Sequence, residues 1–402
     1  MKKLLALFMA FTLTFQLVTP VFAEEIEENQ AATEAVGMET EAPVTEDPTT
    51  EAPVPETAAP EETSAPTEPQ TTTEVTEATA STEETTSATT EPTEETTEPT
   101  LDLFAEDGNV IASGTCGVQG DNLTWVLTKD GNEYTLTISG DGEMENYGYY
   151  SPWSNYEEQI ATIVLKPGMT SIGSYAFRGC IGMNSITIPE GVASIGDEAF
   201  EDCTNLINVS IPVGVTSIGH SAFYGCSKLT RVTIPASVTN IGQSAFCGCT
   251  SLNRVVLSEG VTAIGSSAFY GCSNLTTIKI PAGVTQIAYQ TFRDCSSLTS
   301  VEIPDGVTVI DSDAFYNCGK LTSIELPNSV TEIGASAFKG CWKLASINIP
   351  NSVASIEREA FSGCGSLTSI EIPEGITSLQ KETFYNCGSL ENITLPESLT
   401  SI

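Results

Sequence analysis

A unit of 23 residues repeats without insertion through more than half of the chain. One copy, residues 229–251, reads LTRVTIPASVTNIGQSAFCGCTS. A fixed period of this size is typical of a solenoid, in which each repeat forms one rung and buries its apolar side against its neighbours. A Phe marks the same position of ten copies and a Cys follows each Phe three residues later, from Cys180 to Cys387; the Phe residues are Phe177, Phe200, Phe223, Phe246, Phe269, Phe292, Phe315, Phe338, Phe361 and Phe384.

The apolar positions inside one unit predict its local structure. The segment from Leu229 to Ile234 alternates as a strand does, and Pro235 ends it because proline cannot donate to a ladder. Val238 and Ile241 indicate a second short strand, and residues 244–249 indicate a short helical turn. We therefore expect an α/β solenoid of ~23-residue rungs with one parallel sheet, short second strands and short helical turns, preceded by a small β-rich cap. Eleven strand-like segments, from Ile160 on, would make a parallel sheet about 50 Å long.

The repeat resembles a known bacterial family. Its pattern L-x-x-I-x-I-P-x-x-V-x-x-I-G-x-x-A-F-x-x-C is similar to the BspA-like class of leucine-rich repeats, which occur in bacterial surface and secreted proteins. The similarity covers residues 160–402, and residues 110–165 resemble the segment that precedes such repeats. It implies adhesion or protein binding at the cell surface rather than catalysis. We expect local changes in turn geometry, without a break in the stack, where Ser258 replaces Pro and where Ala288, Asp311, Glu357 and Gln380 replace Gly.

Residues 1–23 have the features of a signal peptide. Lys2 and Lys3 precede an apolar stretch, and Val21-Phe22-Ala23 fits cleavage after Ala23. The alternative is a membrane anchor, but the apolar stretch is shorter than the ~20 residues that a span needs. We therefore expect export to the cell surface or secretion.

Residues 24–100 consist almost entirely of Thr, Glu, Pro and Ala, with 22 acidic and no basic residues. Such a segment has little apolar surface to bury, and its charges repel one another, so the sequence predicts a disordered linker. We interpret it as a spacer; a solubilising tail is the alternative.

Residues 101–159 are interpreted as an N-terminal β-hairpin and aromatic cap. Two alternating segments, 123–128 and 133–139, flank an Asp-Gly pair, which indicates a hairpin. Solenoids need such a cap because the first rung would otherwise expose its apolar side. The alternative is that the aromatic cluster of this region stacks on a sugar; these residues are Tyr147, Tyr149, Tyr150, Trp153 and Tyr156.

Twelve cysteines in an exported chain raise the question of disulfides. Ten of them occupy one repeat position where a small apolar residue is wanted, so we expect free buried thiols, with bridges between adjacent rungs as the alternative. Cys116 and Cys247 fall outside that register. Cys247 stands where other units have Tyr, as at Tyr224 and Tyr270, and is therefore expected to be exposed and reactive.

The sequence favours a non-enzyme without metal or cofactor. Residues 101–402 hold 31 acidic and 13 basic residues, a balance that disfavours nucleic acid and anionic membranes. The only histidine, His220, stands where other units have Asp197 or Gln243, so it is interpreted as a surface residue and not as a catalytic base. There is no phosphate-binding Gly-rich loop and no His/Cys set with the spacing of a metal site.

The third and fifth positions of the L-x-x-I-x-I segment are expected to face outward. They form what we name the charged stripe: Arg231, Arg254 and Lys279, then Glu302, Glu325 and Glu371. We interpret the charged stripe as a docking surface for a protein of complementary charge; the alternative is a solvated face whose charges serve solubility. Trp342 replaces Ser, Thr or Gly of other units and is a candidate binding anchor, or a local packing residue.

Three functions remain open at this stage. The first is a secreted or surface adhesion protein whose solenoid binds an extracellular protein, from host matrix or a neighbouring cell. The second is a carbohydrate-binding accessory module of a polysaccharide-degrading system, and the third is a surface scaffold without a specific ligand. Because the chain stops at Ile402, part-way through a repeat, we also expect it to be a fragment or to lack a last module.

Overall fold

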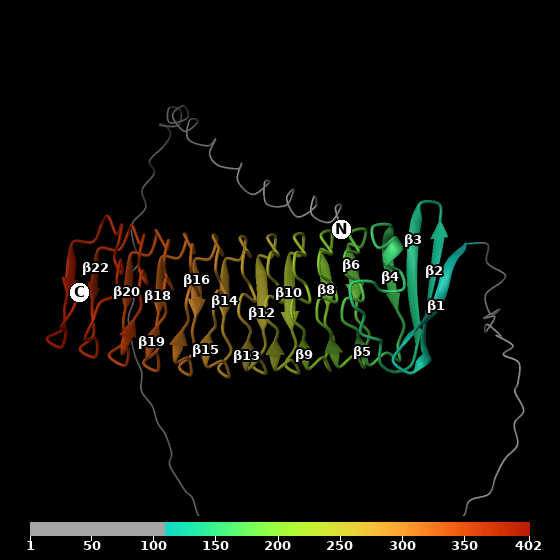
Figure 1. Ribbon diagram of the computed structural model, residues 1–402, viewed down its shortest axis with the longest axis horizontal. Coiled ribbons are helices and arrows are strands. Elements are labelled where there is room, and N and C mark those ends of the chain that lie inside the picture. The colour runs from blue at the N-terminus through green and yellow to red at the C-terminus, as the bar shows by residue number, and fades with distance from the viewer. Residues whose placement is uncertain (1–108) are drawn as a thin grey trace, which may run out of the picture. The chain divides into compact units, whose positions relative to one another are not determined.

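The computed structural model describes residues 109–402, so the predicted signal peptide and the linker of residues 24–100 lie outside the described residues. The described part begins with a four-stranded sheet at one end of the stack of rungs (Figure 1). β1 pairs antiparallel with β2, β2 with β3, and β3 then pairs in parallel with β4. The sheet therefore passes from an antiparallel cap to the first parallel strand of the solenoid. The strands are β1 Val110–Gly117, β2 Gly120–Asp130, β3 Glu133–Gly140 and β4 Ile160–Leu165.

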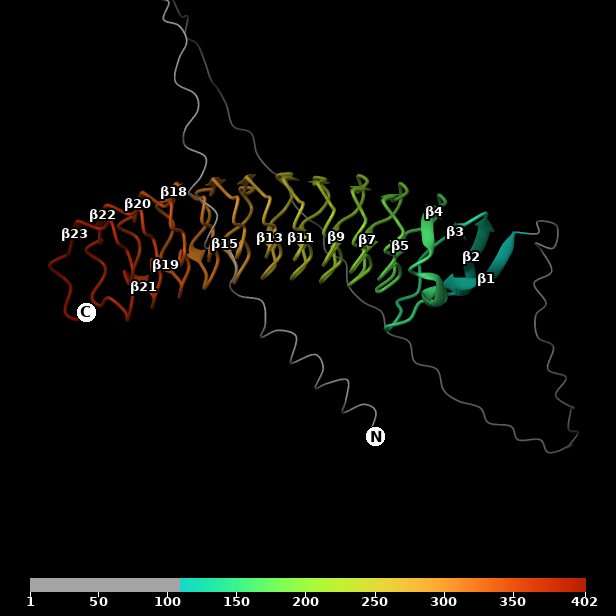
Figure 2. The ribbon, with the colours of Figure 1, turned by 90° about the horizontal axis from the view of Figure 1, so that it is seen from above.

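Most of the rungs that follow contribute one strand to each of two parallel ladders, which run side by side along the stack (Figure 1). Seen from above, the rungs succeed one another in chain order away from the cap (Figure 2). The strands of the first ladder are β6 Ser185–Thr187, β8 Asn208–Ser210, β10 Arg231–Ile234, β12 Arg254–Leu257, β14 Thr277–Lys279, β16 Ser300–Glu302, β18 Ser323–Glu325, β20 Ser346–Asn348, β22 Ser369–Glu371 and β23 Asn392–Thr394. The second ladder consists of β5 Ser171–Ile172, β7 Ser194–Ile195, β9 Ser217–Ile218, β11 Asn240–Ile241, β13 Ala263–Ile264, β15 Gln286–Ile287, β17 Val309–Ile310, β19 Glu332–Ile333 and β21 Ser355–Ile356.

Strands of the first ladder pair in couples. β10 and β12 pair over four residues, and β14 pairs with β16, β18 with β20 and β22 with β23 over three each. β8 pairs with β6 over three residues but with β10 only through Asn208 and Arg231. The first ladder is therefore interrupted after β12, after β16 and after β20, whereas β6, β8, β10 and β12 form one sheet. The second ladder is continuous from β5 to β13 and from β15 to β21.

The predicted helical turn of each unit is wrong. Residues 244–249 form successive tight turns whose backbone N–H groups alternate between two kinds of acceptor. Ser244, Phe246 and Gly248 donate to the next rung at 2.8–2.9 Å, while the residues between them donate to carbonyls three residues earlier in their own rung. Ser244 and Gly248 have φ of 54° and 73°, so a run of right-handed helical residues cannot form. The only helix in the described part of the chain is the short 3₁₀ turn η1, Ser154–Tyr156.

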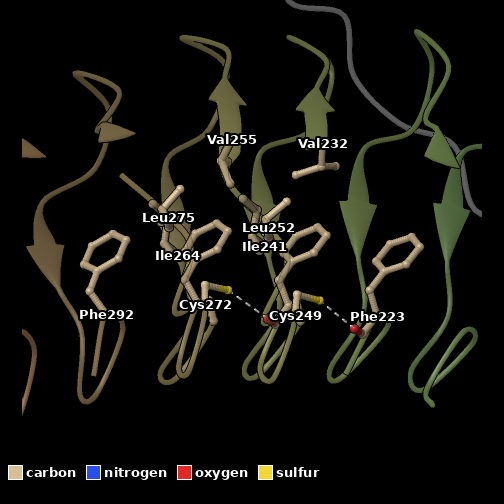
Figure 3. Close-up of a cluster of buried hydrophobic side chains, with 14 of the residues drawn as sticks. Phe223, Val232, Ile241, Cys249, Leu252, Val255, Ile264, Cys272, Leu275 and Phe292 are labelled. Atoms are coloured by element: carbon tan, nitrogen blue, oxygen red, sulfur yellow. Dashed lines mark hydrogen bonds between the residues drawn. The ribbon is translucent and has the colours of Figure 1, made fainter. Parts of the chain in front are cut away.

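The Phe residues form one continuous ladder in the core (Figure 3). Neighbouring rings from Phe177 to Phe384 are stacked with centroids 5.1–5.8 Å apart. Trp153 lies at the cap end of this ladder, stacked on Phe177 at 5.8 Å, and its Nε1 donates to the carbonyl of Ala176 at 2.7 Å. The cap therefore closes the Phe ladder with an indole whose polar group is satisfied.

The ten cysteines that follow the Phe residues are free thiols, and nine of them have a fixed hydrogen-bond acceptor. Cys249 Sγ donates to the carbonyl of Phe223 in the preceding rung at 3.2 Å, and the other cysteines from Cys203 to Cys387 repeat this contact (Figure 3). The same carbonyl also accepts from the N–H of Cys226, so it is satisfied twice. This repeat position therefore holds a small buried side chain that also donates a hydrogen bond. The sequence predicted only a small hydrophobic residue there.

We predict that Phe292→Ala lowers the free energy of unfolding by about 3–5 kcal/mol, because it removes a fully buried ring from the middle of the ladder and leaves a cavity. Urea unfolding followed by circular dichroism measures this loss. Tyr289→Ala in the same rung is the matched control, since that ring is 43% exposed and its removal costs little. Equal losses in the two variants would contradict the ladder's role.

We predict that the native thiols react slowly with Ellman's reagent at pH 8, because burial raises their pKa, that of Cys341 to about 12. Cys387 is only half-buried and is expected to react first, so Cys387→Ser removes the fastest phase. Unfolding in guanidinium should expose all twelve thiols. Fewer than twelve reactive thiols in the unfolded, unreduced chain would instead indicate disulfides between rungs.

Candidate functional site

The exposed face of the first ladder carries the charged stripe. In most of these strands the middle side chain is buried and its two neighbours are exposed, as in Thr277–Lys279 and Ser300–Glu302. The third and fifth positions of the sequence motif therefore face outward. The stripe, however, consists of two columns, because Arg231 and Arg254 begin their strands, whereas Lys279 and the three glutamates end theirs.

The two arginines are direct neighbours without a counter-ion. Arg231 and Arg254 are partners in the register of β10 and β12, so like charges lie on adjacent strands about 4.8 Å apart. Neither has an acidic group within 4.0 Å among residues 109–402. Lys279 differs, since its Nζ lies 3.3 Å from Glu259 Oε1, and Glu302 is its register partner on β16. Within the charged stripe, the positive charge without an ion pair therefore lies on β10 and β12.

Beside these arginines the face is hollowed. A depression of 640 Å³ lies along β8 and β10, which share only one register pair. Arg231 and Ser258 line it together with apolar side chains, of which Val213 is 76% exposed. The apolar residues are Val209, Ile211, Val213, Pro235 and Ala236. The sequence prediction did not include this hollow, although Val213 could have indicated it: the residue after the strand-ending position is polar, acidic or Ala in the other units.

Trp342 projects from the turn that follows Cys341 and is 53% exposed. Its six-membered ring rests on Gly319 of the preceding rung, where an added Cβ would lie 2.3 Å from the ring. One face of the indole is thus used for packing, and only a glycine accommodates it there. The remaining exposed part keeps Trp342 as a candidate contact for a partner.

The predicted sugar-stacking role of Trp153 is wrong, because this side chain is fully buried. Its spacing from Phe177 is 24 residues instead of 23, which hid its place in the Phe ladder. Tyr147 packs edge-on against Trp153 with centroids 5.7 Å apart, and its hydroxyl donates to the carbonyl of Cys116 at 3.3 Å. Tyr156 packs near Tyr134 at 6.1 Å.

Tyr149 and Tyr150 are the accessible members of the predicted glycan-binding set, with 68% and 81% of their surface exposed. The Tyr149 ring lies 5.8 Å from that of Tyr175, and the guanidinium of Arg178 lies 5.4 Å from its centre. This group of exposed rings is near the cap end of the stack and apart from the charged stripe.

The family assignment rests on a match to residues 170–299, 217–341 and 285–402 by the model of the BspA type leucine rich repeat region, which finds six copies. The chain belongs to this family. A leucine rich cell surface protein from Faecalibacterium prausnitzii A2-165 is 30% identical, over 73% of this chain and 90% of that chain, with a TM-score of 0.47. A leucine-rich repeat protein from Eubacterium ventriosum ATCC 27560 is 27% identical, over 72% and 87%, with a TM-score of 0.48.

One from Bacteroides ovatus ATCC 8483 is 28% identical, over 70% and 89%, with a TM-score of 0.39. A comparison with curated proteins finds no match. Residues 109–402 contain no helix with the length and apolar character needed to cross a bilayer. The BspA-type solenoid is thus a repeat protein related to bacterial surface proteins.

The residues that replace Gly of the BspA-type pattern differ in their effect on the second ladder. At Asp311, which replaces Gly, the backbone N–H donates to Ile287 at 2.9 Å, the same distance as from Gly242 to Ile218. Ala288 and Gln380, which also replace Gly, donate no such bond, and the second ladder is interrupted between β13 and β15. The expected local change in turn geometry is therefore found at these two positions and not at Asp311. Ser258, which replaces Pro, donates its hydroxyl to the carbonyl of Ile234 at 2.7 Å and lines the hollow.

The predicted exposure of Cys247 is wrong. This thiol is 8% exposed, and burial raises its pKa to about 11, so the reactive thiolate is scarce near neutral pH. The neighbouring units place a long Tyr side chain at this position, whose end reaches solvent at Tyr224, whereas the short Cys side chain stays covered.

His220 lies next to a hydroxyl but lacks the rest of a catalytic arrangement. Its Nε2 is 3.2 Å from Ser221 Oγ, while Asp197 Oδ1 accepts from the backbone N–H of His220 and not from its ring. A base that activates serine needs a partner that orients the imidazole. Within residues 109–402 no group of three or more His, Cys, Asp or Glu side chains could hold a metal ion.

We predict that Arg254→Glu raises the free energy of unfolding by about 0.2–1 kcal/mol at low salt, because it replaces a like-charge cross-strand pair by an attractive one. Urea unfolding at low and high salt measures the gain, which salt should weaken. Lys228→Glu changes the net charge equally but lies outside the strands, so it controls for overall charge. A lower stability of Arg254→Glu than of this control would contradict the predicted repulsion.

Proposed function

We propose that this chain is an exported protein of the bacterial surface or its surroundings, which adheres to an extracellular protein through the exposed face of the first ladder. The observation that carries the proposal is the pair Arg231 and Arg254. Two neighbouring cations without counter-ions cost stability in a chain whose residues 101–402 hold 31 acidic groups. A negatively charged partner would remove that repulsion on binding.

Three further observations support this proposal. The chain is related to a leucine rich cell surface protein from Faecalibacterium prausnitzii, and residues 1–23 have the pattern of a signal peptide. The acidic residues Glu302, Glu325 and Glu371 lie farther along the same face. A surface with separated positive and negative ends orients an incoming partner, and such steering raises the association rate more than the affinity.

The test is a binding screen of the mature chain, residues 24–402, against immobilised extracellular matrix proteins and a glycan array. We expect binding to at least one matrix protein that weakens as ionic strength rises. The double variant Arg231→Glu/Arg254→Glu should reduce it about tenfold or more, since it reverses the charge at the contact. Lys228→Glu/Lys320→Glu makes the same change of charge outside the strands and should bind like the wild type.

A second candidate function is glycan binding by the exposed rings of Tyr149 and Tyr150, because aromatic faces stack on sugar rings. Glycan binding that persists in the arginine double variant and is lost in Tyr149→Ala/Tyr150→Ala would replace the first proposal. Binding to neither class of ligand would leave a scaffold without a specific ligand.

A further inference from the structure

The hollow between β8 and β10 combines features that do not occur together elsewhere on the first ladder. It lies along β8 and β10, whose pairing narrows to the single register pair of Asn208 and Arg231. Val209, the middle residue of β8, is only half-buried, whereas the corresponding Val232 of β10 is 2% exposed. Val209 thus leaves part of an apolar side chain accessible, whereas the middle residue is buried in every other strand of this ladder except β23.

The rim of the hollow is apolar where other rungs are polar. The residue that follows the strand-ending position is acidic or Asn in seven units, Ala in two, and Val only at Val213. Single exposed aliphatic side chains are common on protein surfaces, so Val213 alone indicates nothing. Its position is informative because Ala236 lies at the equivalent place of the next rung, and both line the hollow with Pro235.

The charge at the hollow is positive and uncompensated. Arg231 lines it, and Arg254 is the register partner of Arg231 on β12. A guanidinium presents several N–H donors in a plane that matches a carboxylate. An apolar depression with a free guanidinium at its edge fits a ligand that presents an aliphatic side chain and a carboxylate close together.

We propose that this hollow binds an extended segment of a partner protein in which an acidic residue neighbours an aliphatic one. The aliphatic side chain contacts Val209 and Val213, while Arg231 binds the carboxylate and Ser258 offers a hydroxyl. The inference rests on the proposed function and specifies the chemistry of the partner. Exposed Ser and Thr positions elsewhere on the ladder lack this apolar floor.

The probe is a synthetic Glu-Val-Glu-Val peptide with blocked ends, measured against the mature chain by isothermal titration calorimetry. We expect salt-sensitive binding with one site, which Val213→Glu weakens about tenfold because it places a carboxylate where an aliphatic contact is needed. Val213 is largely exposed, so this variant should fold as the wild type does. Ala282→Glu makes the same substitution at the equivalent position three rungs on and should bind normally.

Two control peptides separate the contributions. Glu-Ser-Glu-Ser keeps the charge and Lys-Val-Lys-Val reverses it, and we expect each to bind at least about tenfold more weakly. Equal binding of Glu-Ser-Glu-Ser, absence of binding by Glu-Val-Glu-Val, or unchanged binding by Val213→Glu would overturn the inference. If Arg231→Glu/Arg254→Glu loses binding to a matrix protein but Val213→Glu retains it, the proposed function stands and the hollow is not the binding site.

Hydrogen exchange identifies an occupant that comes from the chain itself. We expect the amides of β8 and β10 to gain protection only when the peptide is added. Protection that is already present without peptide and is lost in Val213→Glu would mean that a segment of this chain, or a second copy, fills the hollow. That result would overturn the proposal of a separate partner.

Discussion

Hydrogen bonds between equivalent residues of successive rungs are the constraint on which the rest of this structure depends. In the turn segment every second backbone N–H donates to the next rung, as from Phe246 to Ala268, and the thiol of Cys249 donates back to Phe223. Both contacts join residues about one period apart, so an insertion of one residue would break them and displace a ring of the Phe ladder. The same requirement explains why the repeat keeps its length in every unit, because each rung is the template for the next.

This constraint acts on the core and leaves the outward positions free to vary. Where charged residues meet on the turn face, they are mostly balanced: Arg293 Nη1 lies 2.8 Å from Asp313 Oδ2, and the same guanidinium lies 4.0 Å from the ring centre of Tyr316. The strand face differs at Arg231 and Arg254, which are neighbours without such a balance. A stack that can place any residue at these positions has no structural need for two adjacent cations, so their presence is better explained by a ligand than by folding.

The period of the sequence predicted the solenoid, the two strands of each rung and the Phe ladder, because buried positions repeat at fixed spacing. It did not predict the turns. Ala245, Phe246 and Cys249 have the spacing of a helical face, and Ser244 gives no sign of its positive φ. The indication lay two residues after each Phe, where only Gly, Asp or Asn occurs, as at Gly248 and Asp294; these residue types tolerate the left-handed conformation best. The candidate site could be predicted only in part, since the outward direction of Arg231 follows from alternation but the reduced pairing of β8 with β10 does not.

Some residues differ in type from those at the equivalent position of the other units. They fall into two groups, according to whether the adjacent rung accommodates the changed side chain. Trp342 stands where other units have small residues, and the preceding rung presents Gly319, the one residue type that can accommodate its ring. A departure that the adjacent rung accommodates is explained by packing. Val213 departs from polar residues without any such accommodation: its side chain remains 76% exposed, and the next rung places Ala236 and Arg231 beside the same hollow. Packing within the stack does not account for that side chain, and its place beside Ala236 and Arg231 is what supports the proposed ligand at the hollow.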